Sequence, residues 1–110
     1  MATKKTTKKT TTKSLPYVIT RGYRSGVHAG ELVARNADGM IVLRNARRIW
    51  SWSGAASLSE LAVYGAKNRA QCRFGARIER HEIQREDVAE IIHCQPAGRR
   101  MIEEQAEWRA

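Results

Sequence analysis

Short runs of β-branched and aromatic residues recur along the chain, and polar or glycine-containing segments separate them, as is typical of β-strands. The run Tyr17–Thr20 follows Pro16 and predicts a first strand. The runs Glu31–Arg35 and Met40–Arg44 flank residues 36–39, whose sequence Asn-Ala-Asp-Gly predicts a hairpin turn with glycine at its left-handed position. The second arm of this hairpin is expected to continue as a strand to Trp52, because aromatic and β-branched residues persist until Gly54.

The hydrophobic spacing then becomes helical. Ser57 and Glu60 match a capping box, which predicts a short helix to about Tyr64 that ends at Gly65. Residues 74–83 and 88–94 read as two further strands separated by the charged residues 84–87, and together they predict a second meander. Pro96 opens a final helix that is expected to run to Trp108, with Met101, Ile102 and Gln105 on one face.

These elements predict an α+β fold. The expected architecture is a small, strongly bent antiparallel sheet or a partly open barrel of about five strands with two short helices. Residues 15–110 are expected to form a single α+β domain, and the Lys/Thr-rich residues 1–14 a disordered tail, because they carry too little apolar surface to fold. Unpaired strand edges would need cover, so a homo-oligomer is expected.

The formal net charge of +9 is unevenly placed. Five of these charges lie in the N-terminal tail, which contains no acidic residue. Lysines that neutralise phosphates release counterions, so the tail predicts salt-sensitive binding to nucleic acid that does not depend on sequence; a solubilising tail or a flexible tether is the alternative. The lysines of the tail are Lys4, Lys5, Lys8, Lys9 and Lys13.

Several function classes find no support in the pattern. No apolar run reaches the roughly 20 residues that cross a bilayer, and no secretory signal follows the N-terminal lysines, so we expect a cytoplasmic protein without membrane contact. Cys72 and Cys94 are expected to be free thiols that pack as small hydrophobic side chains. With His81 and His93 they match no paired metal-ligand spacing, and no nucleophile has a recognisable base motif, so neither a metal, a cofactor nor an enzymatic activity is expected.

The stretch around Trp50 is the most specific candidate for ligand contact. Alternate residues of a strand share a face, so Arg48, Trp50 and Trp52 would point the same way and form a platform on which a base stacks while the arginine meets a phosphate. The alternative is that the tryptophans belong to the core, opposite Ile41 and Leu43.

A glycine-rich segment at residues 22–30, which is predicted to be a loop, is the second candidate. Its backbone amides could form an anion-binding concavity flanked by arginines, with His28 as a hydrogen-bonding group. The alternatives are solvated arginines and a structural histidine. Together with the platform, the candidate ligand-binding residues are Arg21, Arg24, Ser25, Gly26, His28, Arg47, Arg48, Trp50 and Trp52.

Five segments carry a resemblance to a known family. They are Tyr17–Ile19 with Arg21, Ser25–Gly30, Ala46–Trp50, Trp52–Ala55 and Ser57–Ala62. On these residues, the chain from Tyr17 to about Cys94 resembles a family of short, functionally uncharacterised proteins of tailed phages and prophages. Members of that family look like bare domains, so the lysine-rich tail of this chain is a departure from their pattern.

The resemblance implies a protein of a phage-infected host cell or of the virion. Three roles would suit that setting: handling nucleic acid, sequestering a nucleotide signal of host defence, or occupying a place in the particle. We therefore expect a non-enzymatic accessory protein that binds nucleic acid or a nucleotide. The alternatives are a virion protein whose basic tail contacts packaged DNA or a capsid or tail subunit, and an inhibitor that binds a host protein.

Overall fold

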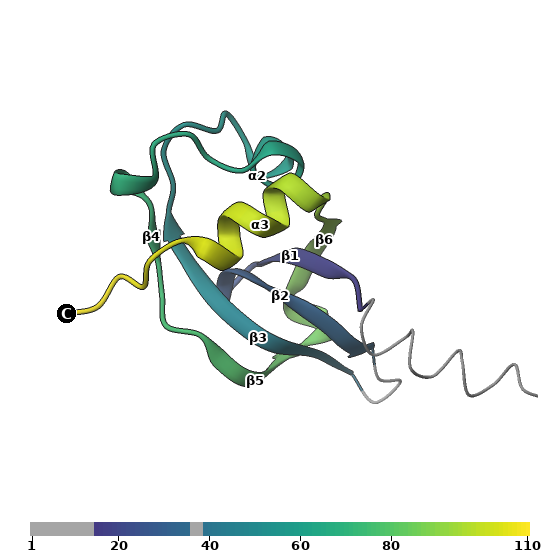
Figure 1. Cartoon of the computed structure of the whole chain (residues 1–110). Coiled ribbons are helices and arrows are strands. Elements are labelled where there is room, and N and C mark those ends of the chain that lie inside the picture. Colours follow the sequence, from purple (N-terminus) through teal and green to yellow (C-terminus); the bar gives the residue numbers. More distant parts are fainter. Residues whose placement is uncertain (1–14, 36–38) are drawn as a thin grey trace, which may run out of the picture.

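The computed structural model describes residues 15–35 and 39–110 of the chain, which form a six-stranded antiparallel sheet and two α-helices (Figure 1). The strands are β1 (Tyr17–Gly22), β2 (Gly26–Arg35), β3 (Met40–Ser51), β4 (Arg73–Phe74), β5 (Ile78–Gln84) and β6 (Val88–His93). The helices are α2 (Leu58–Tyr64) and α3 (Pro96–Glu104), and two single 3-10 turns are η1 (Arg69–Gln71) and η2 (Arg85–Asp87). The α+β class is thus confirmed. The expected tail at residues 1–14 and the hairpin residues 36–38 lie outside the described residues.

The order of the strands differs from the predicted second meander. β1, β2 and β3 are consecutive neighbours, but β5 pairs with β3 at one side of the sheet and β6 pairs with β1 at the other. The prediction that β5 and β6 form a meander is therefore wrong. The three residues of η2 connect these two sides, so the sheet must bend to bring its edges near one another. It remains an open sheet, because no ladder joins β5 to β6 in the described part of the chain.

The predicted strand at residues 74–83 is two strands. β5 pairs with the first half of β3 up to Ala46, whereas β4 pairs with the end of β3 at Ile49 and Ser51. Between them the chain turns toward the C-terminal segment, where the Arg77 amide donates to the Glu107 carboxylate at 3.1 Å. A tertiary contact thus interrupts a pattern that looks continuous in the sequence.

The glycine-rich segment is mostly strand, so its prediction as a loop is wrong over residues 26–30. Only residues 23–25 form a turn, and β2 begins at Gly26, whose φ of 85° lies in the left-handed region. Gly30 pairs with Val18 of β1. A Cβ atom at Gly30 would lie 3.0 Å from the Cα of Ala46, so a side chain there would press on β3, which passes close by. Gly30 therefore serves close strand packing, whereas Gly26 supplies the left-handed conformation at the end of the turn.

Two hydrophobic clusters lie on opposite faces of the sheet, since Val18 and Ile19 of β1 belong to different clusters. The helices α2 and α3 cover one face, where they pack on each other so closely that a Cβ atom at Gly98 would clash with the backbone of α2. Buried residues of the helix-covered cluster include Ile19, Ile49, Leu61, Phe74, Met101 and Ile102. Those of the other cluster are Val18, Leu32, Ile41, Leu43, Ala46 and Ile83.

The helix signals of the sequence are largely confirmed. Ser57 accepts a hydrogen bond from the Glu60 amide at 3.2 Å, and Gly65 ends α2 with a φ of 82°. The Glu60 carboxylate, however, accepts from the amide of Ala56 and not from that of Ser57. Helix α3 ends at Glu104, so its predicted extension to Trp108 is wrong. No helix in the described part of the chain has the length and apolarity to cross a membrane.

The two thiols are free, as predicted. Cys72 is buried in the helix-covered cluster, and Cys94 is half-buried against it. Burial raises the pKa of Cys94 to about 12, so this thiol stays protonated and unreactive at neutral pH.

Candidate functional site

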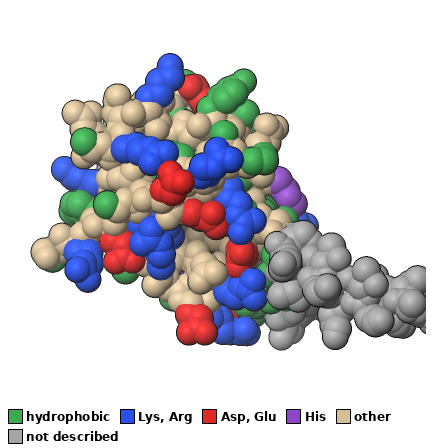
Figure 2. Space-filling view, in the orientation of Figure 1, with side chains coloured by type: hydrophobic (Ala, Val, Ile, Leu, Met, Phe, Trp, Pro, Cys, Tyr) green, Lys and Arg blue, Asp and Glu red, His purple; other side chains and the backbone are tan. Residues whose placement is uncertain are grey.

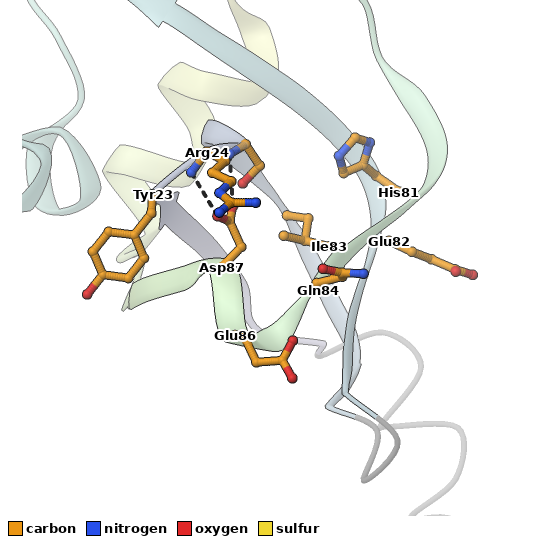
Figure 3. A pocket seen from close by; sticks show the side chains of 9 residues that line it. Tyr23, Arg24, His81, Glu82, Ile83, Gln84, Glu86 and Asp87 are labelled. Carbon is orange, nitrogen blue, oxygen red and sulfur yellow. Dashed lines mark hydrogen bonds between the residues drawn. The ribbon is translucent and has the colours of Figure 1, made fainter.

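The turn between β1 and β2 is held by the protein's own carboxylate. The amides of Arg24 and Ser25 donate to the two carboxylate oxygens of Asp87, each at 2.8 Å, as Figure 3 shows. The amide of Tyr23 donates to the Asp87 carbonyl, also at 2.8 Å. The concavity that the sequence predicted for an external anion therefore exists, but Asp87 occupies it. Its amides are not free to receive a phosphate in this structure.

A cavity of about 650 Å³ lies beside this turn, between residues 23–25 and the chain from β5 to η2 (Figure 3). Its charged lining consists of Arg24 against three carboxylates, those of Glu82, Glu86 and Asp87. The excess of negative charge disfavours an anionic ligand. The cavity is therefore a poor site for a nucleotide phosphate.

Two of the predicted arginines are already engaged. Arg21 lies on β1 and pairs with Glu90 of β6, with 2.7 Å between its Nε atom and the carboxylate. Arg47 is 1% exposed and donates to four main-chain carbonyls, at 2.6 to 3.4 Å. It cannot reach a ligand at the surface. The Arg47 carbonyl partners are Phe74, Gly75, Ile102 and Gln105.

His28 is fully buried on β2. Its ring centroid lies 4.4 Å from that of His81 on β5, and neither of its ring nitrogens has a hydrogen-bond partner among the described residues. Burial, aided by His81 and Arg48, lowers the pKa of His28 to about 4, so the ring is neutral at physiological pH. The pKa of His81 is lowered as well, by burial and by Arg48. His28 is therefore an interior group and not a contact for a surface ligand.

The predicted platform is present in part. Trp50 is 61% exposed, and the guanidinium of Arg48 lies over its ring, 5.7 Å from the centroid. Arg48 also donates to the Ser25 carbonyl at 2.6 Å, which orients its side chain. Trp52 lies beyond the end of β3, is half-buried against the helix-covered cluster and donates to the Ala55 carbonyl at 3.2 Å. Arg48 and Trp50 thus share an exposed face, whereas Trp52 belongs to the packing.

A second exposed indole comes from the C-terminal segment. Trp108 is 46% exposed, and its ring lies 6.3 Å from that of Trp50, with an angle of 64° between the two planes. The guanidinium of Arg73 on β4 lies over the Trp108 ring, 5.4 Å from its centroid. We call these four side chains, in the order Arg48, Trp50, Trp108 and Arg73, the tryptophan–arginine row. Trp108 and Arg73 were missed by sequence reasoning, which placed Trp108 on a helix.

Main-chain and side-chain contacts hold Trp108 beside β4. Its amide donates to the Phe74 carbonyl at 2.8 Å, and Glu107 forms a parallel bridge with Phe74. Arg77 donates to the Glu107 carboxylate from both its amide and its guanidinium, at 3.1 Å in each case. Figure 1 shows the C-terminal segment leaving α3 and passing β4. The position of the second indole is therefore set by the fold.

The arginines of the row have no described ion-pair partner, and the surface seen in Figure 2 carries charges of both signs. Neither Arg48 nor Arg73 forms an ion pair with any residue that the structure describes. On the face seen in Figure 2, Lys and Arg side chains are interspersed with Asp and Glu side chains and do not form one continuous patch. Both arginines of the row are thus without a described carboxylate partner, although Arg48 also donates to the Ser25 carbonyl.

The fold and the site define a small α+β domain that carries an exposed tryptophan–arginine row on an open antiparallel sheet. A family model described as Domain of unknown function (DUF6948) matches residues 15–102, so the chain belongs to that family. The matched range includes Arg48, Trp50 and Arg73 and ends before Trp108. No curated protein and no solved structure matches the chain.

Proposed function

We propose that this protein is a non-enzymatic binder of nucleic acid, which it contacts through the tryptophan–arginine row and the lysine-rich N-terminal segment. The observation that carries the proposal is the pair of exposed indoles, 6.3 Å apart, with a guanidinium over each ring. Aromatic side chains stack on bases, and arginine adds cation–π contact and charge for the backbone. The row combines these elements in one surface.

A comparison of the two candidate sites favours nucleic acid over a free nucleotide as the ligand. The cavity beside the β1–β2 turn has a volume that suits a small molecule, but its lining is acidic and its loop amides bind Asp87. The row has the arginines and the aromatic faces, but it lies on the outer surface. A polymer can cover such a surface by contacts at several successive nucleotides, whereas a single nucleotide gains too few.

The lysine-rich N-terminal segment supports the same ligand class through its composition. Five lysines and no acidic residue among the first 13 residues would neutralise phosphates without reading sequence. Affinity from this segment falls steeply with salt, whereas stacking on the indoles does so less. The two contributions can therefore be separated by the salt dependence of binding.

The bend of the sheet supports a finer description of the architecture as a partly open barrel. The three residues of η2 join strands on opposite sides of the sheet, and a backbone hydrogen bond at each end continues the neighbouring ladder into this connection. The Arg85 amide donates to the Gly39 carbonyl at 2.6 Å, and the Tyr23 amide to the Asp87 carbonyl at 2.8 Å. The row lies at the β3–β4 edge of this sheet.

The test is a titration of the full chain against a fluorescently labelled oligonucleotide, followed by anisotropy at low salt. Trp50→Ala is expected to weaken binding about tenfold, because one base loses its stacking partner. Tyr64→Ala is the matched control, since Tyr64 is an aromatic side chain on α2 that is 73% exposed and lies outside the row. Its affinity should equal that of the wild type. No detectable binding by the wild type at low salt would contradict the proposal.

A further inference from the structure

We propose that the row recognises single-stranded nucleic acid by stacking on at least two unpaired bases. This inference rests on the proposed function and names the class of its ligand. In a double helix the base faces are covered by neighbouring base pairs, so an indole can stack only on a base that is unpaired or at an end. Trp50 and Trp108 are 61% and 46% exposed, which leaves ring surface for such contact.

The geometry of the two indoles favours bases that are splayed apart. Stacked bases of a duplex lie parallel to one another, about 3.4 Å apart along the strand. The two rings of the row are inclined by 64°, with centroids 6.3 Å apart. Bases stacked on both rings would therefore be inclined and separated in the same way, which a flexible single strand can adopt and a duplex cannot.

The two arginines extend the row at both ends. Arg48 lies over Trp50 and Arg73 lies over Trp108, so a guanidinium faces one side of each indole and a base would stack on the ring surface that stays exposed. Because a guanidinium meets the phosphate oxygens between successive bases, the row offers contacts for the backbone on either side of the stacked pair. Stacking and backbone contacts are tolerant of sequence, and we expect little preference among bases.

The proposal makes Trp108 as important as Trp50. Its position depends on the Phe74 carbonyl and on the Arg77–Glu107 contacts, which hold the C-terminal segment against β4. Trp52, the third tryptophan, is half-buried and hydrogen-bonded to Ala55, so it does not take part. The proposal therefore requires the exposed Trp108 and not the half-buried Trp52, so it is more specific than a general need for aromatic residues.

The experiment compares a single-stranded oligothymidine with a blunt DNA duplex of equal phosphate number, each titrated into the full chain at low and at moderate salt. The single strand is expected to bind about tenfold more tightly than the duplex at moderate salt. Trp108→Ala should remove most of this difference by weakening single-strand binding about tenfold while leaving duplex binding unchanged. Trp108→Phe keeps a stacking ring and should retain most of the single-strand affinity.

The controls keep failure of the two proposals apart. Unchanged urea midpoints of both Trp108 variants show that they fold, and Tyr64→Ala should bind both ligands as the wild type does. Equal or tighter binding of the duplex, or equal losses for both ligands in Trp108→Ala, would overturn the single-strand proposal while nucleic-acid binding itself stands. Absence of binding to either ligand at low salt would overturn both proposals.

Discussion

The β1–β2 turn and the tryptophan–arginine row both contain groups that can bind an anion, but these groups differ in how far the fold already occupies them. At the turn, the amides of Arg24 and Ser25 are satisfied by Asp87, and the neighbouring cavity is acidic. In the row, the indoles are exposed and the arginines lie over them without an ion pair to any described residue. The turn amides are thus engaged within the fold, whereas the row keeps exposed side-chain surface, even though Arg48 also donates to the Ser25 carbonyl.

Arg47 and Arg48 show the same contrast within one strand. They are adjacent on β3, so their side chains point to opposite faces. Arg47 is buried and binds four carbonyls, whereas Arg48 lies at the surface between the Ser25 carbonyl and the Trp50 ring. Identical side chains therefore have a structural role at one position and a candidate binding role at the next.

The largest expected effect is on the free energy of unfolding, and it distinguishes Arg47 from Arg48. Arg47→Met removes four hydrogen bonds to main-chain carbonyls and should lower the free energy of unfolding by about 4 kcal/mol, at about 1 kcal/mol for each hydrogen bond. Arg48→Met, the matched control, should lower it by only about 1 kcal/mol because one such bond is lost. Urea denaturation measures both. Similar losses for the two variants would contradict the structural assignment.

The next largest expected effect is the pH dependence of stability that arises from the buried, neutral His28. The folded pKa of His28 is depressed to about 4, below the unfolded value of about 6.5, so the unfolded chain binds the extra proton first. The contribution of this group to stability is complete above pH 6.5 and is lost as the pH falls toward 4, to a total of about 3 kcal/mol. Unfolding free energies measured across this range should show the slope.

His28→Gln removes one titrating ring and should reduce that slope, whereas His93→Gln, a change of an exposed histidine on β6, should leave it unchanged. The lowered pKa of His81 retains a part of the slope in the His28 variant. His81 and Arg48 are the charged or titratable neighbours that oppose protonation of His28. The row consists of tryptophan and arginine, residue types that do not titrate near neutral pH, so oligonucleotide affinity should stay constant from pH 6.5 to 8. A steep loss of affinity between pH 6.5 and 8 would instead link binding at the row to the titrating groups near the turn.

The smallest expected effect on binding comes from the turn itself. Asp87→Ala frees the amides of Arg24 and Ser25 and should lower the urea midpoint, because the turn loses the carboxylate that holds it. The affinity for single-stranded DNA should remain within about twofold of the wild type, since both indoles and Arg73 are untouched and only the Ser25 carbonyl that orients Arg48 belongs to the turn. Glu86→Ala, which alters a neighbouring carboxylate of the same cavity, should leave the midpoint unchanged. An affinity loss as large as that of Trp50→Ala would place the binding site at the turn.

Local patterns predicted the individual elements well. The strand character of residues 17–20 and 40–51, the helix start at Ser57 and its end at Gly65 depend on neighbours within a few residues, and the structure has them. The buried face of α3 with Met101, Ile102 and Gln105 follows from helical spacing in the same way. The glycines at residues 26 and 30 misled the prediction, because glycine composition is the same for a loop and for a strand that another strand crosses closely.

The sequence by itself determined the α+β class, the β2–β3 hairpin, the presence of Trp50 and Arg48 on one face and the concentration of lysine at the N-terminus. Only the tertiary structure decided that β5 and β6 lie on opposite sides of the sheet, that Arg47 is buried, and that Trp108 completes the row. The physical reason is the distance along the sequence over which each kind of signal acts. Strand and helix signals arise from adjacent residues, whereas burial and the pairing of two distant indoles depend on how the sheet bends and where the C-terminal segment binds it.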